Sequence, residues 1–578
     1  MTTRSEIIMR LGGEGGEGVI SAGDFFAQGS ARTGYHLFTF RTYPAEIKGG
    51  HAWYQVRVGP NPVRSMGDGV DVLVAFNAEA YFNHKDTLNP DGVLIYDPDT
   101  VTPAGGHKTV YPIPFNKIAK DELNFFRGKN MVVTGAIAGL FGLEPSSLEG
   151  LIKQRFHRRP ELLEQNLRAL YNGYDFARKK LEKQDPFYLG EPATRVARLV
   201  LSGNDAIVAG ALFAGCRYYA GYPITPASEI LEGMAKELPK LGGVSLQAED
   251  EIASIGSVIG ASFAGAKAMT ATSGPGLALM TEFLGYAGMS ETPCVIVDAQ
   301  RSGPSTGMPT KLEQGDLNHS LYAGHGDFPR AVIAPGSVGD CFFQIINAFN
   351  MAERYQLPVI FLSDQSLSHR TEAVTMPDLG KIKVTDRLQP SAADLKNSHF
   401  QRYRLTASGI SPMSVPGTPG GMYVAPGLEH DELGHVDNPL ESHLKMMPKR
   451  QAKVEACRQE ASRDCCARYG DPDAKIGLIG WGSTEGAIQE AVDRARAAGH
   501  KVAALHPKVV YPLPFEEIQR FVDSVSHVIV PEVNFSGQFA RYLRTEVDVH
   551  PIRVNKYAGL PFMPREIYRK IEEVANHA

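Results

Sequence analysis

Residues 249–276 read EDEIASIGSVIGASFAGAKAMTATSGPG and are the most informative stretch for the fold. Three carboxylates precede a run of small and apolar residues, which predicts a buried helix beginning near Glu251. The segment KAMTA at residues 267–271 predicts a buried strand, and the glycines and proline after it predict a turn into another helix. This alternation of helix, strand, turn and helix is typical of an α/β sheet.

The same alternation continues on both sides and predicts an α/β protein with three α/β domains. We place them at residues 1–190, 195–385 and 471–578, with a parallel sheet in the first and the start of the second near Arg198. Residues 386–470 are rich in Pro, Gly, His and Met and lack periodicity, so we predict an extended arm there. Predicted strands lie at residues 6–11, 36–40, 51–58, 70–76, 92–96, 217–220, 267–271, 293–298, 331–333, 358–362, 476–479, 501–506 and 527–530.

Composition narrows the class of protein. The 578 residues carry a net charge of −5 and no Lys/Arg-rich run, so we expect no nucleic-acid partner. The sequence begins without the pattern of a secretory signal, and it contains no run of about 18 apolar residues that would span a membrane. We therefore expect a cytoplasmic protein without a membrane segment.

The cysteines are scattered and include no C-x-x-C pair. They are Cys216, Cys294, Cys341, Cys457, Cys465 and Cys466. An iron–sulfur cluster is usually held by several closely spaced thiolates. We therefore predict no metal ligands in this chain and expect any cluster to lie on another polypeptide.

Two loops after predicted strands carry side chains suited to an anionic ligand. In Tyr222-Pro-Ile-Thr-Pro, the prolines stiffen the chain and Thr225 projects its hydroxyl near a helix N-terminus, where anions are favoured. Arg301 follows the strand VIVDAQ and offers a planar fork that can hold a carboxylate in two hydrogen bonds. The plain alternatives are a helix cap at Thr225 and an ordinary ion pair at Arg301. Loops after strand C-termini bind ligands in open α/β sheets, which favours a site here.

A glycine loop near the N-terminus offers a second hypothesis. Gly13, Gly15 and Gly18 fit the dinucleotide motif G-x-G-x-x-G between a strand and a helix. The acid expected at the end of the second strand is missing, because Arg41 stands there, and two glutamates inside the loop would repel a pyrophosphate. A tight turn with another ligand role, or none, is the better interpretation.

Together these motifs resemble the 2-oxoacid:ferredoxin oxidoreductases. The resemblance rests on GGEGGEG at residues 12–18, YPAEIKGGH at 43–51, YPITP at 222–226 and the stretch 249–276, and it covers nearly the whole chain. It implies a γ-type domain fused to an α-type domain that binds the pyrimidine of thiamine diphosphate, followed by a transketolase C-terminal-like domain. It also implies a β subunit that carries Mg²⁺, the diphosphate half of the thiamine site and a [4Fe–4S] cluster. The implied assembly is a heterotetramer of two α–β pairs.

Gly67-Asp68-Gly69 begins like the metal-binding motif of thiamine enzymes. The asparagine that this motif requires is missing at the proper distance, since Asn89 is too near and lies in LNPDG, which we interpret as a turn. We interpret Gly67-Asp68-Gly69 as a turn before the strand VDVLVAF. The absence of the motif agrees with a metal site on the partner.

The resemblance also assigns roles to residues. In the family, a glutamate just before the small-residue helix bonds the aminopyrimidine and promotes formation of the thiamine carbanion, and its spacing favours Glu251 over Glu249. Thr225 matches a threonine that faces the substrate, and Arg301 matches an arginine near the substrate carboxylate. Electrons leave singly for ferredoxin, and coenzyme A takes the acyl group. Further implied cofactor contacts are Tyr222, Gly274 and Gly276.

The loop RSGPSTGMPT at residues 301–310 resembles that of enzymes acting on 2-oxoglutarate or on a broad range of 2-oxoacids. We expect Arg301 and Thr306 to hold a distal carboxylate, with Lys311 as a helper. The resemblance therefore implies a 2-oxoglutarate synthase, working in oxidative decarboxylation or in the reductive carboxylation of a reductive TCA cycle. A pyruvate or broad-range enzyme, a nicotinamide-dependent Rossmann oxidoreductase and a non-catalytic scaffold remain alternatives. We expect the N-terminal domain to cover coenzyme A.

Overall fold

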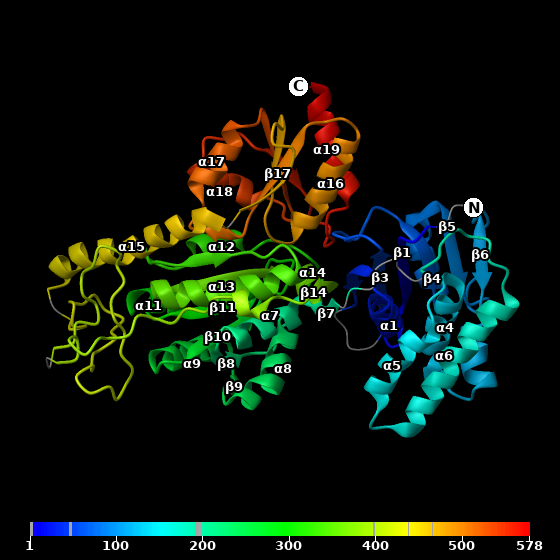
Figure 1. The fold of residues 1–578 in the computed structure, drawn as a ribbon, viewed down its shortest axis with the longest axis horizontal. Coiled ribbons are helices and arrows are strands. Elements are labelled where there is room, and N and C mark those ends of the chain that lie inside the picture. The colour runs from blue at the N-terminus through cyan, green and yellow to red at the C-terminus, as the bar shows by residue number, and fades with distance from the viewer. Residues whose placement is uncertain are drawn as a thin grey trace. The chain divides into compact units, whose positions relative to one another are not determined.

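The computed structural model describes residues 4–44, 49–190, 196, 198–396, 399–436, 438–464 and 466–577, with the backbone alone for 461–464. The chain forms three β-sheets in two compact units (Figure 1). The first unit comprises Met1–Ser202 with His369–Pro377, and the second comprises Gly203–Ser368 with Asp378–Ala578. The predicted α/β fold class with three sheets is confirmed.

The first unit is built on an eight-stranded mixed sheet in the order β6-β5-β4-β1-β3-β2-β14-β7. Its strands are β1 (Ile7–Glu14), β2 (His36–Thr42), β3 (His51–Gly59), β4 (Val70–Ala75), β5 (Leu88–Tyr96), β6 (Thr109–Pro112), β7 (Arg198–Ser202) and β14 (Thr371–Thr375). Strands β1, β4, β5 and β6 run parallel, and the remaining pairings are antiparallel. The predicted parallel sheet is therefore wrong for half of the strands. The connection from β2 to β3 is too short for the crossover that parallel strands need.

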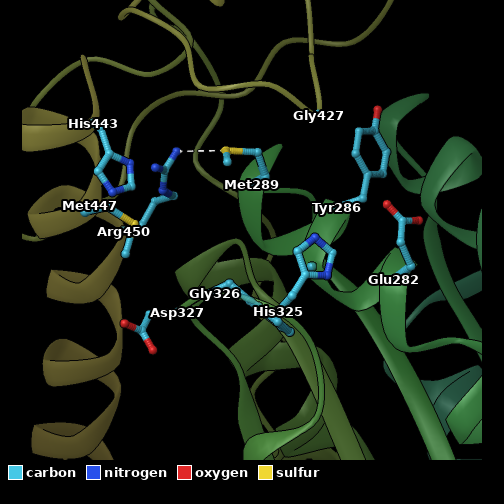
Figure 2. A pocket seen from close by; sticks show the side chains of 12 residues that line it. Glu282, Tyr286, Met289, His325, Gly326, Asp327, Gly427, His443, Met447 and Arg450 are labelled. Carbon is cyan, nitrogen blue, oxygen red and sulfur yellow. Dashed lines mark hydrogen bonds between the residues drawn. The ribbon is translucent and has the colours of Figure 1, made fainter. Parts of the chain in front are cut away.

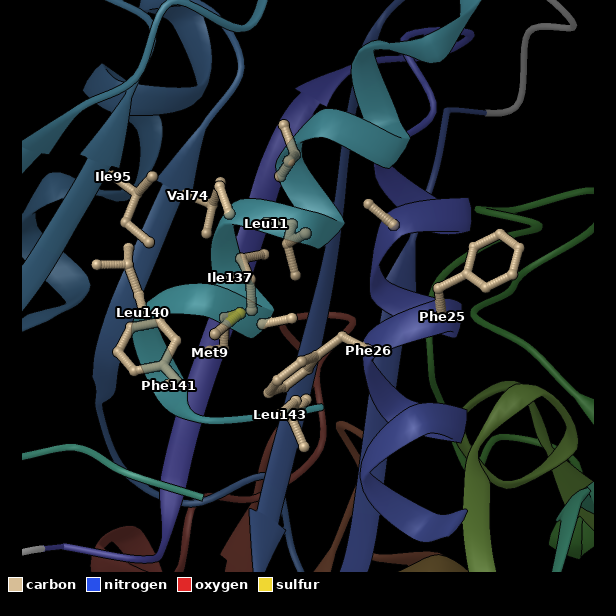
Figure 3. Close-up of a cluster of buried hydrophobic side chains, with 14 of the residues drawn as sticks. Met9, Leu11, Phe25, Phe26, Val74, Ile95, Ile137, Leu140, Phe141 and Leu143 are labelled. Carbon is tan, nitrogen blue, oxygen red and sulfur yellow. The ribbon is translucent and has the colours of Figure 1, made fainter. Parts of the chain in front are cut away.

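Helices cover this sheet and bury its main core. They are α1 (Val19–Arg32), α2 (Ala78–His84), α3 (Phe115–Lys117), α4 (Lys129–Phe141), α5 (Pro145–Phe156) and α6 (Pro160–Lys180). Helix α4 is buried on nearly every face and contacts both α1 and α6. Figure 3 shows Phe26 of α1 and Ile137 of α4 in one apolar cluster with Met9 and Leu11 of β1.

Two short strands differ from the predicted domain limits. We placed the start of the second domain near Arg198 and residues 371–375 inside it, whereas β7 and β14 both lie in the first sheet. Strand β14 pairs with the edge of β2 through Glu372 and Phe38 and with β7 along its length. Pairing satisfies the backbone groups that an edge strand would otherwise expose. Strand β5 also begins earlier than predicted, so LNPDG lies in a strand and not in a turn.

The second unit contains a seven-stranded sheet in the order β18-β12-β13-β11-β10-β8-β9. All pairings are parallel except that of β12 with β18. The strands are β8 (Cys216–Gly221), β9 (Val244–Gln247), β10 (Lys267–Thr272), β11 (Cys294–Gln300), β12 (Ala331–Ile333), β13 (Pro358–Asp364) and β18 (Val509–Tyr511). The helices are α7 (Gly203–Phe213), α8 (Ser228–Glu237), α9 (Glu251–Phe263), α10 (Gly274–Leu279), α11 (Thr281–Met289), α12 (Leu317–Tyr322), α13 (Val338–Tyr355) and α14 (Gln365–His369).

The third sheet has the order β15-β17-β16-β19-β20 and belongs to the same unit. Its strands are β15 (Cys466–Gly470), β16 (Ile476–Ile479), β17 (Val502–Pro507), β19 (His527–Glu532) and β20 (Ile552–Asn555). Its helices are α16 (Glu485–Ala497), α17 (Phe515–Asp523), α18 (Gln538–Glu546) and α19 (Pro564–His577). Strand β18, from the C-terminal region, joins the seven-stranded sheet, and one apolar cluster includes residues of both regions. The second and third predicted domains therefore share a core.

The predicted arm is correct only in part. Among the described residues from 386 to 438, none lies in a helix or strand, but α15 (Pro439–Asp464) and β15 follow. Pro448 lies inside α15, and an internal proline argues against a helix when the sequence alone is considered. The irregular part is also anchored: Arg387 donates to both carboxyl oxygens of Glu353 at 2.7 and 2.6 Å, within the protein interior.

Candidate active site

The carboxyl ends of four neighbouring parallel strands meet at one edge of the seven-stranded sheet. Strands β8, β10, β11 and β13 end there. Tyr222 and Thr225 follow β8, Gly274 and Gly276 follow β10, and Arg301 follows β11. The fold therefore brings the principal predicted site segments to the edge where ligands bind in open α/β sheets.

The three acids at the start of α9 have different surroundings. Glu249 is exposed, and Asp250 caps the helix by accepting a hydrogen bond of 2.7 Å from the Ala253 N–H. Glu251 is the first residue of α9 and is 6% exposed. Its carboxyl accepts no hydrogen bond from the residues that the structure describes. Because buried polar groups are normally hydrogen-bonded, this carboxyl is suited to a donor from a ligand.

The turn after β10 fits closely around Glu251. A Cβ atom at Gly276 would lie 2.6 Å from Oε1 of Glu251 and 2.0 Å from Oγ1 of Thr272. Such distances are well below van der Waals contact, so a larger residue would displace the carboxyl. Gly276 therefore allows Glu251 to lie against the first turn of α10.

Arg301 lies below the surface beside Thr225. The side chain is 8% exposed, and its Nη1 donates to the backbone oxygen of Thr225 at 2.7 Å. Its Nε has no hydrogen-bond partner among the described residues. Burial lowers the pKa of Arg301, an effect that the carboxyls of Asp316 and Asp298 oppose. The Arg301 guanidinium can therefore still donate a hydrogen bond to a carboxylate.

The other predicted substrate-binding residues, Thr306 and Lys311, belong to the loop that follows Arg301. Thr306 is exposed, and no hydrogen bond joins it to Arg301 in the described part of the chain. The loop is closed by hydrogen bonds from Ser302 N to the Lys311 oxygen at 3.0 Å and from Met308 N to the Ser302 oxygen at 2.9 Å. The Lys311 side chain runs along Gly559, and burial lowers its pKa. Roles for Thr306 and Lys311 stay predictions.

Sequence analysis missed two carboxyls close to Arg301. Asp298 of β11 is fully buried, and Asp316 precedes α12. Burial, together with the charge of the Asp316 carboxyl, raises the pKa of Asp298 well above its ordinary value. Burial also raises the pKa of Asp316, to about 6. Asp298, an aspartate within the otherwise apolar segment VIVDAQ, was the sequence signal that could have pointed to these acids.

Gln314 was also missed. Its backbone N–H donates to the Val533 oxygen at 2.6 Å, and its side-chain oxygen accepts from the Val533 N–H at 3.0 Å. Its side-chain nitrogen donates to the Trp481 oxygen at 3.0 Å, and Asn534 donates to its backbone oxygen at 3.0 Å. Gln314 is fully buried and fixes the loop after Arg301 against strand ends of the third sheet.

The N-terminal glycine loop contains its own anion. The Glu17 carboxylate accepts from the Glu14 N–H at 2.8 Å, from Asn77 Nδ2 at 2.8 Å and from Lys129 Nζ at 2.9 Å. These donors are of the kind that would bind a phosphate. The carboxylate disfavours a dinucleotide here, in agreement with the interpretation from sequence.

A cavity of about 340 Å³ lies elsewhere in the second unit (Figure 2). Glu282, Tyr286 and Met289 of α11 line one side, and His443 and Arg450 of α15 line another. No predicted site residue lines this cavity.

The described residues contain neither a metal-binding cluster nor a membrane-spanning helix. No group of three or more His, Cys, Asp or Glu side chains there is arranged to hold a metal ion. No helix in the described ranges has the length and apolar character needed to cross a membrane.

Comparisons with known proteins identify the family. Family models match at residues 8–176 (pyruvate ferredoxin/flavodoxin oxidoreductase), 209–449 (its thiamine-diphosphate-binding region) and 474–562 (pyruvate:ferredoxin oxidoreductase core domain II). The chain is 32% identical to 2-oxoacid:ferredoxin oxidoreductase 1 subunit alpha of Aeropyrum pernix, covering 99% of this chain and 98% of that one. The chain belongs to the 2-oxoacid:ferredoxin oxidoreductase family. It is an alpha-type subunit of such an enzyme.

Two further members of the 2-oxoacid:ferredoxin oxidoreductase family agree. The 2-oxoglutarate oxidoreductase subunit KorA of Mycobacterium tuberculosis is 34% identical, covering 98% of this chain and 91% of that one. The structure of the 2-oxoglutarate:ferredoxin oxidoreductase from Magnetococcus marinus, with 2-oxoglutarate, coenzyme A and succinyl-CoA bound, is 43% identical. It has a TM-score of 0.93 and 99% coverage of both chains. The predicted enzyme class is confirmed.

Proposed function

We propose that this subunit acts on 2-oxoglutarate, transferring its acyl group to coenzyme A and its electrons to ferredoxin. The observation that carries the proposal is the buried Arg301 guanidinium. Its Nη1 donates to the Thr225 oxygen, and its Nε has no partner in the described residues. The M. marinus relative with bound 2-oxoglutarate and coenzyme A supports this choice. A pyruvate or broad-range enzyme is the alternative.

The residues of the strand edge fit thiamine diphosphate. The buried Glu251 carboxyl, without a donor among the described residues, suits the aminopyrimidine N–H, and Gly276 leaves room beside it. When bound, the cofactor supplies the carbanion that attacks the 2-oxo carbon. Glu251 then holds and orients the pyrimidine and favours the tautomer that removes a proton. Tyr222 and Gly274 line the same edge, and Thr225 presents its hydroxyl toward the substrate.

A partner chain completes the site in this proposal. Four of the five cysteines in the described residues are buried, and we assign the [4Fe–4S] cluster and Mg²⁺ to a β subunit. Large apolar side chains lie exposed near the strand edge, a pattern typical of protein interfaces. They are Tyr222, Leu246, Ile252 and Leu279. A heterotetramer of two α–β pairs and a cytoplasmic location stay predictions.

Coenzyme A is assigned to the N-terminal unit. The M. marinus relative, whose structure contains bound coenzyme A, supports this assignment. We expect this unit to contribute to the coenzyme A site as a cover.

The substrate assay tests the proposal. The chain is co-purified with candidate small subunits, and ferredoxin reduction is measured with 2-oxoglutarate, pyruvate and 2-oxobutyrate in the presence of coenzyme A. We expect the highest kcat/KM for 2-oxoglutarate. A higher value for pyruvate would replace the proposal by the pyruvate alternative.

A further inference from the structure

A basic cavity lies beside α18 and β20, the edge strand of the third sheet. Its volume is about 270 Å³. It is lined by Ala540, Arg541, Arg544, His550, Pro551 and Arg553. Three of these described lining residues are arginines, one is a histidine, and none is acidic. The cavity therefore gathers positive charge without a carboxylate in its wall.

Within the described residues, the three arginines of this cavity form no ion pair with a carboxylate. The acids that follow Arg544 in the sequence, Glu546 and Asp548, do not line the cavity. Arg541 and Arg544 are three residues apart on α18, so their side chains are neighbours on the helix surface. Like charges at this spacing repel each other and destabilise a helix. A bound anion would offset this repulsion.

The start of α18 is bonded to an acid of the protein itself. Glu532, the last residue of β19, is fully buried. Its carboxyl accepts hydrogen bonds from the Phe539 N–H at 2.7 Å and from the Ala540 N–H at 3.0 Å. These bonds fix α18 against the third sheet and use the amides that an anion at the helix start would need. Any anion in the basic cavity must therefore be held by the arginine side chains.

Arg553 reaches the cavity from β20. Its stem lies against Gly537, where an added Cβ atom would be 2.9 Å from Arg553 Cδ, so a larger residue there would displace the arginine. Arg553 Nη1 donates to the Ser536 oxygen at 3.4 Å, which is long for a hydrogen bond. The other N–H groups of this guanidinium stay available to a ligand. The cavity thus combines one arginine from a strand with two from a helix.

We propose that the basic cavity binds a small molecule that carries phosphate groups. A planar guanidinium donates two parallel hydrogen bonds to a phosphate, and several guanidiniums together supply the charge that a diphosphate requires. The volume of about 270 Å³ suits a diphosphate or the phosphate end of a larger molecule. The cavity shares no residue with the strand edge that carries Arg301, so this binding is independent of the proposed substrate.

Titration calorimetry with inorganic pyrophosphate tests the cavity. The complete α–β complex is purified with thiamine diphosphate, so that the cofactor position is filled. The double substitution Arg541→Gln and Arg544→Gln should weaken pyrophosphate binding by at least about tenfold, because it removes charge-assisted hydrogen bonds. Both side chains are exposed, so the Tm should not fall. Arg520→Gln, at an exposed arginine of α17 outside the cavity, is the matched control and should bind pyrophosphate as the wild type does.

A parallel titration with coenzyme A separates two sources of the phosphate. If the double variant loses affinity for both pyrophosphate and coenzyme A, coenzyme A is the ligand of the cavity. If it loses affinity for pyrophosphate alone, the ligand is another phosphate-bearing molecule. Absence of pyrophosphate binding in the wild type, or equal affinity in all three proteins, would overturn the inference. A double variant that no longer co-purifies with the β subunit would also overturn it, because the arginines would then bind an acidic protein surface.

Discussion

Replacing Arg301 by methionine tests which carboxylate the fork holds. The substitution keeps an unbranched side chain as far as the Nε position and removes the guanidinium with its charge and donors. A charge-assisted hydrogen bond contributes about 1.5–3 kcal/mol, which corresponds to roughly one to two decades in kcat/KM. The hydrogen bond to the Thr225 oxygen is lost for every substrate, so its effect cancels when substrates are compared. Only a bond to the distal carboxylate is specific to 2-oxoglutarate.

We therefore expect Arg301→Met to reduce kcat/KM for 2-oxoglutarate by about one to two decades more than for pyruvate or 2-oxobutyrate. Ferredoxin reduction by the α–β complex is the assay, with all three substrates measured on one preparation. Arg301→Lys is the control, because it keeps the charge but loses the planar fork. Equal losses for the three substrates would refute the distal role and place Arg301 on the carboxylate common to all 2-oxoacids.

Three further substitutions or measurements address other parts of the account. Glu251→Gln should abolish nearly all turnover without lowering the Tm, whereas Glu249→Gln, at an exposed position, should be mild; the reverse order would move the cofactor contact to Glu249. Gln314→Leu should lower the Tm and raise the KM, because the buried Val533 N–H and Trp481 carbonyl lose hydrogen-bond partners worth about 1–3 kcal/mol each. An unchanged Tm and KM would contradict the role of Gln314 in fixing the loop after Arg301. Calorimetry should detect no NAD(H) binding, because Glu17 fills the anion position of the loop; micromolar affinity would contradict this.

Strands were predictable where apolar runs are continuous. The segments VIVDAQ and PVIFL became β11 and β13, since both are buried on both faces of a parallel sheet. Strands β14 and β18 are short and join sheets assembled mainly from distant parts of the chain. Their local sequence carries no sign of this pairing, so the predicted domain limits and the arm differ from the structure.

The candidate site was predictable as segments and not as contacts. Motif spacing favoured Glu251, which is buried, over Glu249, which is exposed. The hydrogen bond from Arg301 to the Thr225 oxygen joins segments 76 residues apart, which come together only after folding. Thr306 is exposed, and its predicted role beside Arg301 stays a prediction.

The central claim is that this chain is one part of a 2-oxoacid:ferredoxin oxidoreductase whose cluster lies on a partner. The most direct test measures iron and ferredoxin reduction with 2-oxoglutarate and coenzyme A, first for the chain alone and then after co-purification with a β subunit. We predict that the chain alone contains no iron and shows no turnover. The complex with the β subunit should contain iron and reduce ferredoxin. Stoichiometric iron–sulfur or turnover in the isolated chain would contradict the account.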